Sequence, residues 1–411
     1  MSEMVLVERQ LVKRHNKNFA EIDHLAFLSK NLYNSTLYAV KQAYRETETY
    51  KNFFDLSKEF THSNQPDYRA LPAKVSKATM QLVDKTMKSF FALLRAKKKG
   101  SYDKPVHLPH YLDKNGRQVV FYTKQALSFQ KKGFIRLSKT NIYIPTNRTK
   151  SEVQFVRLIP RGNHYIVEIG YKVFYQPPSK EMKNVVSVDL GINNLMAVGS
   201  NVIKPFLISG RPIKSINQFY NKKIAKQQSK LRKGVFTSDY IQNLWRRRND
   251  KITDYFHKVT TKFVSHLVSN KIDTLIIGEN KGWKQDISCG HVMNQKFCQI
   301  PFDKLKQMLK YKAELRGIQV IFTEESYTSK ASFLDKDEIP KFDGEHHHKF
   351  SGKRIKRGLY KTKLGHFINA DLNGALNILK KGLKVAWNDQ IWSDCVGVCS
   401  TPNLQKISVF C

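Results

Sequence analysis

Three short apolar segments constrain the fold of this chain more than any other feature of its sequence. They cover residues 185–190, 274–278 and 319–323, they are rich in Val and Ile, and polar or glycine residues bound them. Runs of this length and composition are typical of strands that are buried on both faces. Two further strand-like segments, near 195–198 and 205–208, follow the first directly. The second half of the chain is therefore predicted to contain one largely buried sheet.

Helical segments separate these strands. A long basic stretch from about 216 to 270, a segment over 302–316 and a final segment over about 368–379 carry apolar residues at helical spacing. The order of elements from residue 184 onwards is therefore βββ-α-β-α-β-α. This order predicts an α/β domain built on an open sheet.

The first half of the chain has a different pattern. A strand-like stretch from Val5 to Val12 precedes several helical segments, and the last of these carries an apolar stripe formed by Val83, Met87, Phe90, Phe91 and Leu94. From about 105 to 175 the apolar period changes to two, which predicts antiparallel strands. The sequence Gln-Pro-Pro-Ser-Lys at 176–180 interrupts both patterns and predicts a domain boundary.

These changes of pattern predict an α+β multidomain protein. Strand-like segments at 1–25 and 105–180, a helical block at 26–104 and an α/β domain from 184 onwards are its expected parts.

The net charge indicates the class of partner. The chain has 71 Lys and Arg against 34 Asp and Glu, a net charge of +37. A protein from a salt-adapted or ribosome-rich setting, or one that binds a membrane surface, would also be basic. Here the charge is spread along the whole chain and interleaved with 25 Phe and 18 Tyr, a distribution that favours nucleic acid over a membrane. Clusters at 95–99 and 246–248 are candidate contacts to the phosphate backbone.

The apolar runs and the cysteines indicate the cellular compartment in which the protein is expected. No run approaches the roughly 18 residues of a spanning helix, and the N-terminus has no signal-peptide core. The chain has five cysteines, Cys289, Cys298, Cys395, Cys399 and Cys411, too few and odd in number for a disulfide framework. We therefore expect free thiols and a cytoplasmic protein.

Three acids stand where predicted elements open to a common site. Asp189 lies at the end of the first strand of the α/β domain, Glu279 ends the fourth, and Asp371 lies in the first turn of the last helix. In an open sheet the functional crevice lies at strand ends, and carboxylates gathered there repel each other unless cations hold them together. Two divalent ions about 4 Å apart, held by such acids, support phosphodiester cleavage. Oxygen ligands of this kind select Mg²⁺ or Mn²⁺.

At these residues the sequence resembles a known family. The segments VSVDLGINNLMAV, LIIGEN and INADLNGALNIL are similar to the three RuvC motifs of the TnpB family, and WKQ at 283–285, NQKF at 294–297 and ESYTSK at 325–330 also match. TnpB proteins are transposon-encoded RNA-guided DNA endonucleases related to the type V CRISPR effectors. The family's catalytic acids correspond to Asp189, Glu279 and Asp371.

The resemblance implies more than the acids. It implies a β-barrel-like wedge domain at 1–25 and 105–180 with a helical recognition bundle inserted at 26–104. It also implies an RNase H-like RuvC α/β nuclease domain at 184–411, with a zinc-ribbon-like insertion that lacks its cysteines at about 326–366. The protein would be prokaryotic and associated with the nucleoid when bound to its target. The resemblance also implies a transposon-end guide RNA and double-stranded target DNA as partners, with a short target-adjacent motif and no small-molecule cofactor or membrane. An RNA-guided repressor that does not cleave, a DNA transposase and a compact type V CRISPR effector remain alternatives.

One departure from the family concerns zinc. Many relatives carry a zinc ribbon, but the four cysteine positions correspond here to Ser332, Asp335, Lys361 and Leu364. No thiolate remains, so we expect no zinc at this place and a ribbon held by side-chain contacts alone.

Other candidate metal ligands are weak. His346-His347-His348 lies in the intervening loop, and Cys395 and Cys399 lack further partners, so we assign neither group to a metal. Asn369 stands where relatives often have an Asp, and it is a candidate for supporting the site by a hydrogen bond.

Overall fold

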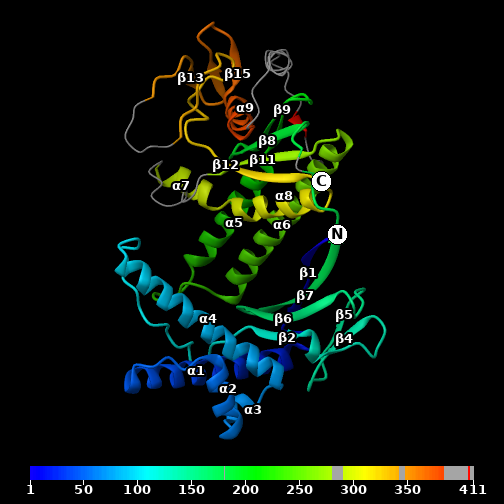
Figure 1. Ribbon diagram of the computed structural model, residues 1–411, viewed down its shortest axis with the longest axis vertical. Coiled ribbons are helices and arrows are strands. Elements are labelled where there is room, and N and C mark those ends of the chain that lie inside the picture. Colours follow the sequence, from blue (N-terminus) through cyan, green and yellow to red (C-terminus); the bar gives the residue numbers. More distant parts are fainter. Residues whose placement is uncertain (180, 280–289, 342–347, 384–405, 408–411) are drawn as a thin grey trace. The chain divides into compact units, whose positions relative to one another are not determined.

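The protein is described by a computed structural model that covers residues 1–411 except 180, 280–289, 342–347, 384–405 and 408–411. It divides into two compact units, one formed by Glu3–Phe174 and the other by Met1–Ser2 with Tyr175–Cys411 (Figure 1). Both units combine helices and sheets, which confirms the predicted mixed α and β multidomain architecture. No helix in the described ranges is both long and apolar enough to cross a membrane.

The strands of the N-terminal unit form two sheets. The larger has the order β1 (Ser2–Lys13), β7 (His164–Tyr175), β6 (Val153–Arg161) and β2 (Val120–Thr123). The smaller has the order β3 (Leu127–Ser128), β4 (Phe134–Leu137) and β5 (Tyr143–Pro145). The pairing of β6 with β2 and β7 confirms the antiparallel strands that the period of two predicts over 105–175.

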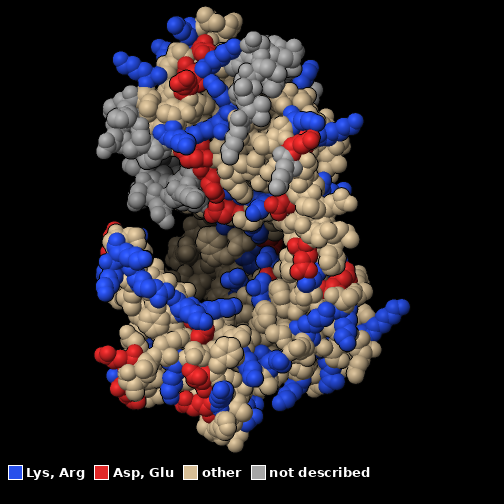
Figure 2. All heavy atoms as spheres, viewed as in Figure 1, with Lys and Arg blue, Asp and Glu red and all other residues tan. Residues whose placement is uncertain are grey.

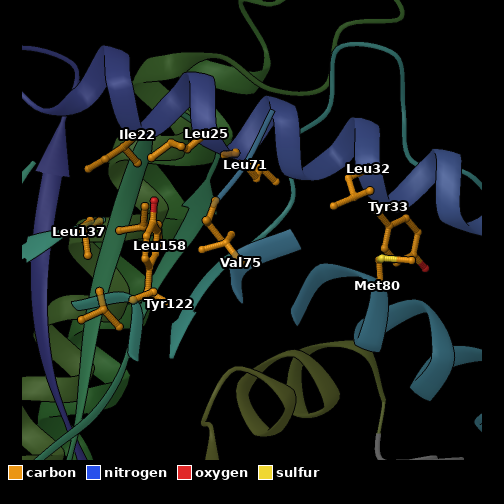
Figure 3. Close-up of a cluster of buried hydrophobic side chains, with 14 of the residues drawn as sticks. Ile22, Leu25, Leu32, Tyr33, Leu71, Val75, Met80, Tyr122, Leu137 and Leu158 are labelled. Carbon is orange, nitrogen blue, oxygen red and sulfur yellow. The ribbon is translucent and has the colours of Figure 1, made fainter. Parts of the chain in front are cut away.

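The helices of this unit lie between β1 and β2 in the chain. They are α1 (Phe19–Thr47), α2 (Phe53–His62), α3 (Pro66–Arg69) and α4 (Ala73–Lys98), and a short 3₁₀ turn (Lys124–Ala126) follows β2. Side chains from α1, α4 and the strands form one apolar core, in which Leu25, Met80 and Leu158 point toward the same interior (Figure 3). The apolar stripe of α4 extends past this core, because Leu94 is 36% exposed.

A single mixed sheet organises the C-terminal unit. Its order is β12 (Gln319–Glu324), β11 (Thr274–Glu279), β8 (Val185–Leu190), β9 (Asn194–Ser200), β10 (Phe206–Ser209) and β16 (Lys406–Ile407). Strands β8, β9 and β10 form an antiparallel meander, whereas β11 is parallel to β8 and β12 is parallel to β11. The carboxyl ends of β8, β11 and β12 therefore meet at one edge of the sheet.

Helices cover both faces of this sheet. The helices of this unit are α5 (Arg211–Gln228), α6 (Asp239–Ser269), α7 (His291–Cys298), α8 (Phe302–Glu314) and α9 (Ala370–Gly382). Val186, Val188 and Ile277 share a core with α6 and α8, whereas the alternate residues Val185 and Ile276 share a core with α9 (Figure 1). Because side chains alternate between the faces of a strand, this double cover explains why the strands are apolar throughout.

One sequence expectation about these helices is wrong in detail. The basic stretch over 216–270 is not continuous, because α5 ends at Gln228 and α6 begins at Asp239. Gly234 adopts a φ of +84° in the intervening segment, and the side chain of Ser238 accepts a hydrogen bond from the Ile241 N–H as the cap of α6. A left-handed residue and a serine cap are both typical of a helix boundary.

A small three-stranded sheet precedes α9. Its antiparallel strands are β13 (Lys353–Lys356), β14 (Leu359–Lys361) and β15 (Phe367–Asn369), and β15 leads directly into the helix. Asn373 and Asn377 of α9 are fully buried, and both side-chain amides donate to the carbonyl of Ala331 at 2.8 Å. The two asparagines lie one helical turn apart on the buried face of α9, and their hydrogen bonds hold the segment after β12 against this helix.

The Asp335 carboxylate joins the loops in which the family resemblance would place the cysteines of a zinc ribbon. Asp335 Oδ2 accepts hydrogen bonds from the Lys363 backbone N–H at 2.8 Å and from the Ser351 hydroxyl at 3.2 Å. Ser332 Oγ accepts from the Asp335 N–H at 3.3 Å. Burial opposes ionisation, but the hydrogen bonds from Ser332, Lys363 and Ser351 outweigh it and hold the pKa of Asp335 below its usual range.

We predict that Asp335→Asn lowers the free energy of unfolding by about 1 to 3 kcal/mol at neutral pH, because the substitution removes a charged acceptor that joins three segments. A depressed carboxylate pKa stabilises the fold above the usual Asp range and loses that contribution as the pH falls through the native pKa. Calorimetry should therefore show the gap between wild type and variant narrowing in acid. The control is Asp254→Asn, which removes an exposed α6 carboxylate paired with Lys258.

Calorimetry also tests the expectation that the protein holds no zinc at these loops. A zinc-selective chelator is expected to leave the melting temperature of tag-free protein unchanged, because the described junction uses hydrogen bonds in place of thiolates. Stoichiometric zinc that survives dialysis, together with a melting temperature that falls on chelation, would refute this expectation.

Candidate functional site

The fold brings the three predicted acids to the same region of the C-terminal unit. Asp189 is the penultimate residue of β8, and Glu279 is the last residue of β11. Val188 pairs with Ile277 in these parallel neighbours, so both acids follow at the same edge of the sheet. Asp371 is the second residue of α9, which contacts both β8 and β9.

Two asparagines hold Asp371 in place. The Asn369 side chain caps α9, because its Oδ1 accepts hydrogen bonds from the backbone N–H groups of Asp371 at 2.9 Å and Leu372 at 3.2 Å. Asn194, the first residue of β9, donates from Nδ2 to Asp371 Oδ2 at 2.7 Å. Asn369 therefore orients the backbone of the acid, and Asn194 orients its carboxylate.

Asp189 lies against the helix that carries Asp371. A Cβ added at Gly374 of α9 would lie 2.8 Å from Asp189 Oδ2, so a larger residue there would require the carboxylate to move. Burial, and then repulsion from the Glu325 and Asp371 carboxylates, raise the pKa of Asp189 well above its usual value, although Arg354 opposes the shift. Asp189 and Asp371 therefore interact electrostatically, as expected for two acids of one site.

A fourth acid, Glu325, was not among the predicted residues. It follows β12 directly, and a Cβ added at Gly278 would lie 2.1 Å from Glu325 Oε1. Burial raises the pKa of Glu325 to about 7; Lys306 opposes this shift, while the Glu279 and Glu324 carboxylates add to it. The sequence contained a signal for Glu325, because it directly follows a strand whose last residue, Glu324, pairs with Glu279.

Two cationic side chains lie beside Asp371 and Glu279. Arg354 of β13 lies 3.4 Å from Asp371 Oδ1, and Lys306 of α8 lies 3.6 Å from Glu279 Oε1. The Lys306 side chain is 5% exposed, although it occupies the apolar face of α8. A lysine at an apolar helical position is a visible signal, whereas nothing in the sequence indicates that β13 reaches Asp371.

The donor set suits a hard divalent cation. Asp189, Glu279, Glu325 and Asp371 offer carboxylate oxygens, which Mg²⁺ and Mn²⁺ prefer. Among the described residues, however, no three His, Cys, Asp or Glu side chains lie close enough together to hold a metal ion. The chemistry of the ligands therefore fits, and the acids must draw closer to share an ion.

Some sequence candidates lie outside the described residues: the segment 283–285, His346, His347, Cys289, Cys395, Cys399 and Cys411. Cys298 is described and is an exposed free thiol. The ring of His348 packs against Tyr327, with 4.8 Å between ring centroids.

The basic clusters differ in exposure. Lys and Arg side chains are spread over the face of each unit that Figure 2 shows. The cluster at the end of α4 includes the exposed residues Arg95 and Lys97. On α6, Arg246 forms an ion pair with Asp250, and Arg248 is only 7% exposed. Contact of the 246–248 cluster with a phosphate backbone stays a prediction, and Arg248 is its buried member.

We predict that the metal-free protein loses stability between about pH 4.5 and pH 7, the interval between the usual pKa of Glu and that of Glu325. A carboxylate whose pKa is raised by folding binds more protons in the native state, so stability falls as the pH rises through this interval. Glu325→Gln should flatten the dependence in calorimetry with EDTA, and the exposed-site control Glu181→Gln should leave it unchanged. An identical pH profile for wild type and Glu325→Gln would contradict the burial of Glu325 beside the Glu279 and Glu324 carboxylates.

Comparison with known proteins adds to this geometry. A family model described as a probable transposase matches residues 164–284, and a Cas12f1-like TNB domain model matches residues 302–378. The TnpB-like protein ORF457 of Acidianus two-tailed virus is 23% identical, with 90% of this chain and 85% of the viral protein aligned. The CRISPR-associated endodeoxyribonuclease Cas12f2 of a Micrarchaeota archaeon is 29% identical, with 50% of this chain and 38% of that protein aligned.

The solved structures include a Cas12f1–sgRNA–target DNA complex at 13% identity and a TM-score of 0.48, which covers 87% of this chain and 82% of that chain. Together, the two family models match parts of the chain that contain all three predicted acids. The alignment with the viral relative covers 90% of this chain. The resemblance to TnpB proteins is confirmed: the chain is a relative of the TnpB-like proteins.

Proposed function

We propose that the protein is an RNA-guided DNA endonuclease that hydrolyses phosphodiester bonds at one RuvC-type site. The observation that carries this proposal is the meeting of Asp189 and Asp371 beside the shared edge of β8, β11 and β12, where Glu279 also ends its strand. An antiparallel meander extended by two parallel strands is the arrangement expected of an RNase H-like domain. The TnpB-like and Cas12f2 relatives support the same activity.

The domain assignment belongs to this proposal. We assign residues 1–25 and 105–180 to a wedge domain, 26–104 to a recognition domain and 184–411 to the RuvC domain, with a ribbon-like insertion at about 326–366. The division of the chain near Tyr175 and the helices α1 to α4 inserted between β1 and β2 support these boundaries.

Asp189, Glu279 and Asp371 would hold Mg²⁺ or Mn²⁺. When bound, two such ions supply an activated water and stabilise the leaving oxygen of the scissile phosphate. Asn369 and Asn194 fix the backbone and the carboxylate of Asp371 before any ligand arrives, which limits the reorganisation that binding requires.

The two cations have a role in the same scheme. Arg354 and Lys306 offset part of the repulsion among the acids while no other cation is present. The guanidinium of Arg354 has a planar fork of donors, so it can turn from Asp371 to a phosphate oxygen of the substrate. Arg354 would thereby help to place the scissile phosphate beside the acids.

Base pairing between a guide RNA and the target strand would supply sequence specificity, and the basic surface would hold the nucleic-acid backbones. A net charge of +37 and the exposed cations at the end of α4 support this division of labour.

A compact type V CRISPR effector is the main alternative, and the match to Cas12f2 favours it. It would use the same site, with a guide transcribed from a repeat array in place of a transposon end. Sequencing the RNA that co-purifies with the protein separates the two. A non-cleaving repressor is disfavoured because all three acids are present.

We predict that Asp189→Ala, Glu279→Ala and Asp371→Ala each reduce Mg²⁺-dependent cleavage of guide-matched DNA by about a thousandfold or more, the upper range for loss of one preorganised group. Gel-shift assays should find guide-dependent DNA binding largely retained. EDTA should stop wild-type cleavage reversibly without unfolding the chain. Asp254→Asn serves as the control, and full cutting by Asp189→Ala would refute the assignment of the site.

Binding of RNA-free protein to nonspecific duplex DNA is expected to weaken by about two orders of magnitude or more between roughly 50 and 200 mM salt, because each phosphate contact releases counterions. A fluorescence anisotropy titration measures the slope. An affinity that barely changes over this range would show that the charge of +37 serves another purpose.

A further inference from the structure

A pocket of about 440 Å³ lies in the C-terminal unit between α6 and the start of α8, and no step of the proposed cleavage reaction uses it. It is lined by Arg248, Asn249, Ile252, Thr253, Cys298, Gln299, Pro301 and Lys304. Two of the lining residues are cations and none is a carboxylate. A pocket of this composition is suited to an anion.

Arg248 supplies a buried charge at this pocket. Arg248 is 7% exposed. Its guanidinium donates hydrogen bonds to Asn217 Oδ1 at 2.8 Å, Gln299 O at 2.9 Å and Asn249 Oδ1 at 3.1 Å. All three acceptors are neutral, and in the described ranges no ion pair includes Arg248. A buried cation that is hydrogen-bonded but not neutralised gains free energy when an anion enters beside it.

Lys304 adds a second positive charge from the first turn of α8. Its ammonium donates to Thr253 Oγ1 at 2.5 Å, which holds it at the pocket. The same residue lies on the pocket lining, where its ammonium can contact an oxygen of an anion that enters. The Thr253 hydroxyl and the Asn249 amide are neutral groups on the same lining that can also donate to phosphate oxygens.

We propose that this pocket binds a phosphate group of a nucleic-acid backbone, with Lys304 as the direct contact and Arg248 as the fixed charge behind it. The proposal deepens the proposed function and rests on it in one respect, namely that the protein binds nucleic acid. Trp245, one turn before Arg248, is 37% exposed, and its ring lies 5.4 Å from the Arg248 guanidinium. An exposed indole beside a phosphate site offers a stacking surface to the adjoining base, which favours nucleic acid over a free inorganic anion.

Cys298 provides a direct probe, because its exposed thiol lies on the pocket lining. The protein would be treated with iodoacetamide after RNase digestion, with its co-purified RNA bound, and with RNA and matched DNA bound. Mass spectrometry of the peptide that contains Cys298 reports the alkylation rate in each state. We expect the rate to fall several-fold when the pocket is occupied; the state in which it falls identifies the RNA or the DNA as the source of the phosphate.

Lys304→Met tests the contact itself, and Lys251→Met, an exposed lysine of α6 outside the lining, is the matched control. Lys304→Met should reduce the slope of log affinity against log salt by about one. It should also restore much of the alkylation of Cys298 in the bound state, whereas Lys251→Met should leave the protection intact. Arg248→Met is not suited to this test alone, because Arg248 also joins α5, α6 and the segment before α8.

The outcomes separate this proposal from the function on which it rests. If wild-type protein binds RNA and DNA but Cys298 reacts equally fast in all three states, the phosphate site is wrong and the proposed function stands. If the protein binds neither nucleic acid, the proposed function itself fails. Protection that persists unchanged in Lys304→Met would also overturn the assignment of Lys304 as the contact.

Discussion

Repulsion among carboxylates at one edge of the C-terminal sheet is the interaction on which the rest of this structure depends. Burial raises the pKa of Asp189, and the Glu325 and Asp371 carboxylates raise it further. Burial also raises the pKa of Glu325, and the Glu279 carboxylate adds to that shift. Such an arrangement costs free energy unless cations stand nearby. Arg354 and Lys306 supply two of them, from a small sheet and from a helix that lie far apart in the sequence. The surrounding architecture therefore keeps acids together that would separate if they were free to move.

The helix α9 links that acidic group to the fold. Its cap, Asn369, and its second residue, Asp371, face the site, while Asn373 and Asn377 fasten the segment that follows β12. Gly374 brings the helix close enough to Asp189 for their interaction. One short segment of sequence therefore sets the position of an acid, the approach of a second acid and the attachment of the segment after β12.

Hydrogen bonds to Asp335 and Asp337 hold the small sheet at the loops where zinc-binding relatives would use thiolates. Asp337 Oδ2 accepts from the Ser332 N–H at 2.7 Å and from the Ser351 N–H at 3.1 Å, close to the bonds that Asp335 receives. A carboxylate can accept several hydrogen bonds at once, so two such groups can join several loop segments without a metal. Arg248 illustrates the same principle with the opposite sign, since neutral acceptors hold a buried cation in position.

The sequence by itself determined the elements and the places of the three acids. Apolar period, strand length and helix caps are local properties, so the strands β8, β11 and β12, the helix α9, and the positions of Asp189, Glu279 and Asp371 at their ends could be predicted from it. Only the tertiary structure decided that Arg354 reaches Asp371, that Lys306 reaches Glu279 and that Arg248 is buried. These contacts join residues from separate elements, and they depend on the order of strands in the sheet and on which face each helix covers, neither of which any local pattern encodes.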